Sequence, residues 1–104
     1  MKSTSIYRIS FANQGKVYEI YARHVSTGSL FGFVEVEELL FGERGSVVID
    51  PGEERLQKEF EGVRRSYLPM HSVLRIDEVE KQGAAKISEL EKGTATVTPF
   101  PVPV

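Results

Sequence analysis

Four glutamates lie within the stretch GFVEVEELLFGERG, which covers residues 32–45. Paired carboxylates serve general acid–base catalysts and metal centres when burial or a charged neighbour separates their pKa values. They also occupy the solvent-facing side of ordinary β-strands. Glu35 and Glu37 alternate with Val34 and Val36, which predicts a half-buried strand with its carboxylates ~6.5–7 Å apart in water. We therefore expect exposed structural residues rather than a catalytic pair.

Other residue types that carry chemistry are sparse. His24 and His71 have no second histidine or carboxylate at the spacing of a metal site. No serine lies in a nucleophile-elbow pattern, and the GERG turn at 42–45 lacks the lysine and following helix of a phosphate-binding loop. The chain has no cysteine, which excludes disulfides, thiolate nucleophiles and cysteine-based zinc sites. We expect no catalytic, metal-binding or cofactor-binding residues.

The segment VRRSYLPMHSVLRI (63–76) combines cations with aromatic residues and contains no acid. Arginine beside aromatic side chains is typical of proteins that bind single-stranded RNA or DNA through phosphates and stacked bases. The candidate interaction face taken from this segment consists of Arg64, Arg65, Tyr67, His71 and Arg75. In the structural alternative, Tyr67 belongs to the core and the arginines pair with residues 35–61, which hold nine acids against three bases.

Alternating apolar residues predict the strands that must position these groups. The expected strands cover 5–12, 16–24, 33–41, 46–50, 63–68, 72–80 and 85–90, and the last of these is also compatible with a helical turn. The Asn-Gln-Gly turn at 13–15 joins the first two strands into a hairpin. In 72–80 we expect Leu74 and Ile76 to point inward, with Arg75 and Asp77 outward.

One helix is predicted over about residues 51–61. Asp50 can cap its first turn, and Glu53 follows three residues later as in a capping box. Leu56 and Phe60 are spaced i, i+4 and form a narrow apolar stripe on one face.

The chain of 104 residues is long enough for one domain with a real core. We predict a globular domain over 1–96 and a proline-rich, extended tail over 97–104, where alternate residues cannot donate to a β-ladder. The expected fold is mainly β with one helix: a small, strongly bent antiparallel sheet or partly open barrel of five to six strands. An α+β sandwich is the alternative.

Net charge is −2, and no apolar run approaches the ~20 residues that span a bilayer. The N-terminus has a lysine but no apolar region typical of a signal peptide. These features, with the absence of cysteine, lead us to expect a cytoplasmic protein with no membrane partner.

Four stretches resemble a family of small, mostly proteobacterial proteins that is known only as a domain of unknown function. They are YRISFANQGKVYEIYARHV, LFGFVEVEELLFGER, VVIDPGEERLQKEFEGVRRSYLPMHSVLRIDEVEKQG and VTPFPVP. The resemblance runs through nearly the whole chain and implies a bacterial, cytoplasmic origin. It supplies no activity, cofactor or catalytic residue.

From these patterns we predict a non-enzymatic interaction module that binds a protein partner or itself. An edge strand, the apolar LLF at 39–41 or the tail at 97–104 would form the contact. One alternative is a module that binds RNA or single-stranded DNA through the basic, aromatic face. A second is an enzyme whose pocket gathers His71, Asp77 and a glutamate.

Overall fold

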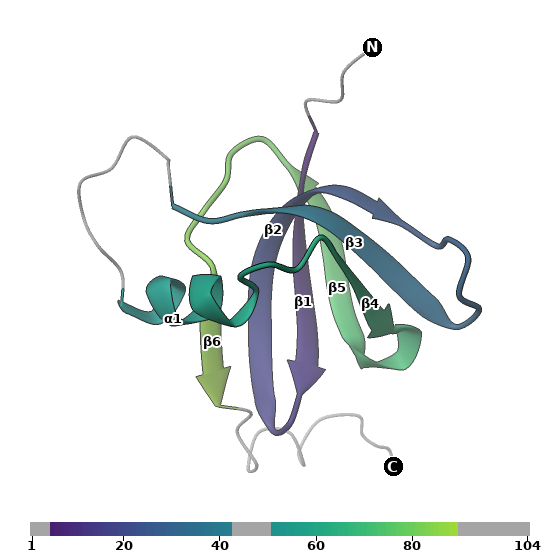
Figure 1. Cartoon of the computed structure of the whole chain (residues 1–104), viewed down its shortest axis with the longest axis horizontal. Coiled ribbons are helices and arrows are strands. Elements are labelled where there is room, and N and C mark those ends of the chain that lie inside the picture. Colours follow the sequence, from purple (N-terminus) through teal and green to yellow (C-terminus); the bar gives the residue numbers. More distant parts are fainter. Residues whose placement is uncertain (1–4, 43–50, 90–104) are drawn as a thin grey trace, which may run out of the picture.

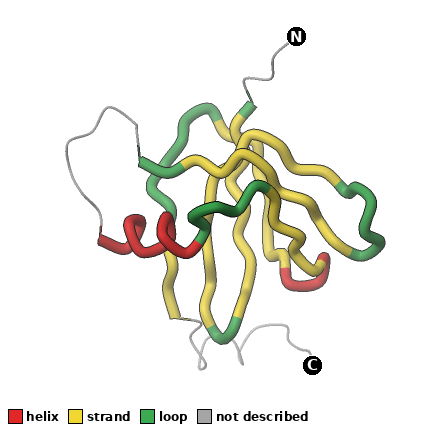
Figure 2. Tube along the Cα trace, in the orientation of Figure 1, coloured by secondary structure: helices red, strands yellow, loops and turns green. Residues whose placement is uncertain are grey.

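The computed structural model describes residues 5–42 and 51–89. They form a bent β-sheet with one α-helix and one short 3-10 helix, η1 (Figures 1 and 2). In chain order the elements are β1 (Ile6–Asn13), β2 (Lys16–Ser26), β3 (Phe33–Leu40), α1 (Pro51–Glu59), β4 (Arg65–Pro69), η1 (Met70–Ser72), β5 (Val73–Val79) and β6 (Lys86–Glu89). The predicted hairpin, helix and last strand are confirmed. The expected strand at 46–50, its end residue Asp50 and the tail at 97–104 lie outside the described residues.

All the strand pairs of the described residues are antiparallel, in the order β4-β3-β2-β1-β5. One edge of β2 is shared, because Lys16–Glu19 pair with β6 and Tyr21–Ser26 pair with β3. A strand that serves two neighbours in this way must bend strongly. β4 and β5 lie at the two ends of the strand order. They do not pair with each other within the described residues, so the barrel is not closed. This is the mainly β, open architecture that we expected.

The bend coincides with a change in which residues face the core. Ala22 of β2 is buried, and the next core contact on this strand is Val25. On β3 the same step runs from Val36 to Leu39, and Glu38 between them has a left-handed backbone with φ +59°. That conformation is uncommon for a residue other than glycine, and here it resets the alternation of faces.

The core lies inside the bent sheet, and α1 packs beside β6 at one side of it (Figure 1). Its buried apolar residues come from every strand except β5 and β6, together with one residue of α1 and one that precedes β6. They are Ile9, Phe11, Tyr18, Ile20, Ala22, Val34, Val36, Leu56, Leu68 and Ala85. Phe11 and Tyr18 stack with ring centroids 4.9 Å apart. The hairpin of β1 and β2 thus provides half of these buried residues.

Among the described residues, Glu53 is the one buried charged side chain, at 5% exposure. Its Oε2 accepts hydrogen bonds from the N–H groups of Gly42 (3.1 Å) and Ala85 (3.3 Å). Burial of a carboxylate is costly unless such donors satisfy it. Glu53 thus ties α1 to the end of β3 and to the start of β6.

We expected Leu74 and Ile76 to point inward, but neither side chain is buried. Ile76 lies opposite the fully buried Ile9, on the inner face, yet it is 37% exposed because β5 is an edge strand. Leu74 stands in a β-bulge, where the register shifts between Arg75 and Val73, and it is 57% exposed. Both side chains add to the surface rather than to the core.

Candidate interaction surfaces

The two glutamates of the alternating strand each hold a neighbouring segment. Oε2 of Glu35 accepts hydrogen bonds from the backbone N–H (2.7 Å) and the hydroxyl (3.2 Å) of Ser29 in the β2–β3 loop. Glu37 forms an ion pair with Arg65 on the adjacent strand β4. Both side chains are half-buried rather than exposed as we expected, because these partners cover them.

The loop that Glu35 holds presents an apolar tip. Phe31 is fully exposed at 101%, and Leu30 beside it is also exposed. Met70 of η1 is also exposed. It lies beside this loop because its N–H donates a hydrogen bond to the carbonyl of Gly32 at 2.8 Å. No pattern in the sequence indicates this tip, because its apolar residues follow no period.

The structure divides the face predicted for nucleic acid. Arg65 pairs with Glu37 and donates to the hydroxyl of Tyr67 at 3.4 Å, while Arg75 pairs with Asp77 at 2.9 Å. Arg64 and His71 are exposed and have no ionic partner within the described residues. Tyr67 is exposed rather than part of the core. Arg65 thus pairs with an acid of residues 35–61, as in the structural alternative, whereas the partner of Arg75 lies outside that range.

Asp77 is the centre of an ionic cluster on the outer face of β1 and β5. Nη2 of Arg8 and Nε of Arg75 each lie 2.9 Å from Oδ2 of Asp77. The hydrogen bond from Arg8, followed by the positive charge of Arg75, lowers the pKa of Asp77 below its ordinary value of 3.8. The cluster therefore favours an ionised carboxylate beside the free edge of the sheet.

Three strands have an edge that pairs with no other strand in residues 5–42 and 51–89, and they differ in how this edge is protected. β6 has only four residues and begins with Lys86, and β4 has five residues and ends at Pro69. Short strands, lysine and proline are devices that prevent edge-to-edge pairing. β5 has seven residues with neither lysine nor proline, and it exposes Leu74 and Ile76. β5 carries other such devices, the bulge at Leu74 and the charged Arg75, Asp77 and Glu78, but it is the longest of the described edges.

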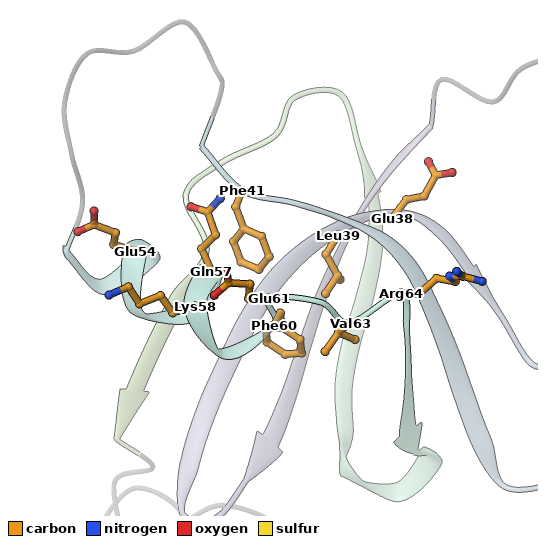
Figure 3. Close-up of a pocket in the computed structure, with 10 residues that line it drawn as sticks. All are labelled: Glu38, Leu39, Phe41, Glu54, Gln57, Lys58, Phe60, Glu61, Val63 and Arg64. Carbon is orange, nitrogen blue, oxygen red and sulfur yellow. The ribbon is translucent and has the colours of Figure 1, made fainter.

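A groove of about 650 Å³ lies between α1 and the end of β3 (Figure 3). Leu39, Phe41, Phe60 and Val63 form its apolar floor, and the rings of Phe41 and Phe60 stack with centroids 6.1 Å apart. Its rim is polar and of mixed charge, with Glu38, Glu54, Gln57, Lys58, Glu61 and Arg64. The LLF segment at 39–41 therefore contributes two residues, Leu39 and Phe41, to a surface groove.

Within residues 5–42 and 51–89, no three His, Asp or Glu side chains gather as a metal site would require. Of the residues in the enzyme hypothesis, His71 lies on η1, and Asp77 lies on β5, where it forms ion pairs with Arg8 of β1 and with Arg75. In the described part of the chain, no helix has the length and apolarity needed to cross a membrane.

Fold and surfaces together define a small, open β-barrel domain with one flanking helix. The chain belongs to the family described as Domain of unknown function (DUF1820), whose model matches residues 5–102. This match confirms the family resemblance noted in the sequence. Comparison with curated proteins and with solved structures gives no significant match.

Proposed function

We propose that the protein is a non-enzymatic interaction module that associates with a second copy of itself through the edge of β5. The observation that carries this proposal is the exposed apolar edge of β5, whose central residues are complementary to their own antiparallel copy. We choose a second copy as the partner because two β5 strands can pair in one register in which both the faces and the charges of opposed residues match. That register follows from elimination.

Opposed residues in an antiparallel pair point to the same face of the sheet. A symmetric pair of β5 strands must therefore centre on a single residue, and the bulge at Leu74 confines the regular edge to Arg75–Val79. Centring on Arg75, Asp77 or Glu78 sets two like charges directly opposite each other, and centring on Val79 sets Glu78 opposite Glu80. Like charges in these positions are destabilising. Centring on Ile76 avoids this.

The register centred on Ile76 forms two ion pairs, related by symmetry, and one apolar contact. Arg75 of each copy lies opposite Asp77 of the other on the outer face, and Ile76 meets its own copy on the inner face. The side chain of Arg75 is 73% exposed, and the contact across the strand pair would replace its ion pair with Asp77 of its own chain. A single strand pair buries less than the ~1,200 Å² of a standard interface, so we expect a weak dimer in the micromolar-to-millimolar range.

The other sequence hypotheses have less support. Nucleic-acid binding would rely on Arg64 and His71, since Glu37 and Asp77 compete with phosphate for Arg65 and Arg75. A catalytic role would need His71, Asp77 and a glutamate in one pocket, whereas Asp77 pairs with Arg8 and Arg75. We further propose a cytoplasmic location, with the cysteine-free composition as its support.

Sedimentation velocity over a concentration series tests the association. The full chain should show an average mass that rises with concentration, and Ile76→Lys should abolish the rise because it opposes two ammonium groups at the centre. Leu30→Lys is the matched control, an exposed apolar residue in the β2–β3 loop that should leave association unchanged. Circular dichroism checks that both variants fold.

A concentration-independent monomer would overturn the proposal. So would equal loss of association in the Leu30 and Ile76 variants, since it would place the contact elsewhere on the apolar surface.

A further inference from the structure

The groove beside α1 points to an extended, uncharged peptide as its ligand. Its floor is apolar and aromatic, and its rim carries acids and bases in similar number, so it selects no net charge. Gln57, Lys58 and Arg64 on the rim are donors, and neither cation has an ionic partner within the described residues. Proline-containing segments suit such grooves, because they leave their carbonyl groups unpaired and lose little entropy on binding.

The chain itself carries a segment of this chemistry. Residues 97–102 read VTPFPV, with no charged side chain and with Phe100 between two prolines. The family model extends through residue 102, so this segment belongs to the region that defines the family. We infer that the groove binds residues 97–102 of the same chain, with Phe100 as the apolar anchor. This inference is independent of the dimer proposed for β5.

The distances allow this segment to bind within one copy. Glu89 ends β6, and eight further residues reach position 97, a span of up to ~26–29 Å when extended. The intervening helix α1 has nine residues and is only ~14 Å long. Lys58 lines the groove and also the hollow that contains Ile87 of β6, so the two sites share one side chain.

Tethering decides between the same chain and a second copy. A short linker gives its ligand an effective concentration of about millimolar, above the working concentration of a second copy. Occupancy from within the chain therefore prevails in dilute solution. A partner protein that presents a similar segment would have to displace residues 97–102.

Heteronuclear NMR of the full chain tests the inference. Phe100→Ser should shift the signals of Leu39, Phe41, Phe60 and Val63, while Val104→Ser, beyond the matched region, should leave them in place. A synthetic peptide of residues 95–104, added to the Phe100→Ser chain, should return these signals toward their original positions. Val63→Asp in that chain should weaken peptide binding by about tenfold or more, because a charge enters the apolar floor.

Three outcomes would overturn the inference. The first is that the NMR signals of the groove residues change neither with Phe100→Ser nor on addition of the peptide. The second is an equal response to Phe100→Ser and Val104→Ser. The third is a response that appears only at high protein concentration, which would assign the segment to a second copy. The NMR signals of β5 report the proposed dimer separately, so each proposal can fail while the other is still tested.

Discussion

Glu53 provides the sharpest energetic test of how α1 is held against the sheet. Replacing it by alanine removes the acceptor of two N–H groups, those of Gly42 and of the buried Ala85. A buried donor left without a partner costs about 1–3 kcal/mol, and a half-buried one less, so Glu53→Ala should lower the free energy of unfolding by about 2–4 kcal/mol. Glu53→Gln keeps a carbonyl oxygen at that position but loses the charge, and should cost about 1–2 kcal/mol.

Urea denaturation measures these differences, with an unchanged slope expected for each variant. Glu54→Ala is the matched control, because Glu54 is an exposed acid in the same first turn of α1. It should cost ~0.5 kcal/mol or less, since it loses only the interaction with the helix dipole. If Glu53→Ala costs no more than Glu54→Ala, the two hydrogen bonds do not hold the helix and the reasoning is refuted.

Three further predictions concern single side chains. Glu35→Gln should speed hydrogen exchange of the Ser29 amide roughly fivefold, since the loss of charge weakens this bond by about 1 kcal/mol; an unchanged rate would contradict the role of Glu35 in holding the loop. Burial raises the pKa of Tyr18 above 10.0, so folding stability should fall as pH rises above that value. Tyr18→Phe should reduce this alkaline loss in denaturation curves, and an equal loss would argue against it. The lowered pKa of Asp77 adds stability above pH 3.8 that is lost as pH falls through the folded value, so Asp77→Asn should flatten the acid limb of the same curves, whereas an equally steep limb would contradict this.

Local patterns were sufficient for the hairpin and the helix. Period-two alternation around the Asn-Gln-Gly turn gives the observed pairing of Asn13 with Lys16, because a tight turn fixes its own register. The apolar stripe on α1 was recognisable, yet its two members have different roles. Leu56 is in the core, while Phe60 lies on the groove floor, and only the position of β3 decides this.

Non-local geometry explains what the patterns missed. Alternation assigns Ile76 to the inner face, but it cannot show that β5 has no second neighbouring strand among the described residues. The left-handed Glu38 breaks the alternation of β3 and so brings Leu39 to the floor of the groove. The partners of Arg65 and Arg75 likewise depend on strand pairing and not on their spacing along the chain.

Mixing two charge-reversed variants tests the self-association through β5 most directly. In the register centred on Ile76, Arg75→Glu and Asp77→Lys each oppose like charges across the strand pair and should be monomeric alone. An equimolar mixture restores two attractive pairs, and sedimentation equilibrium should then show a heterodimer. A mixture that stays monomeric, or single variants that associate as the unmodified chain does, would contradict the account.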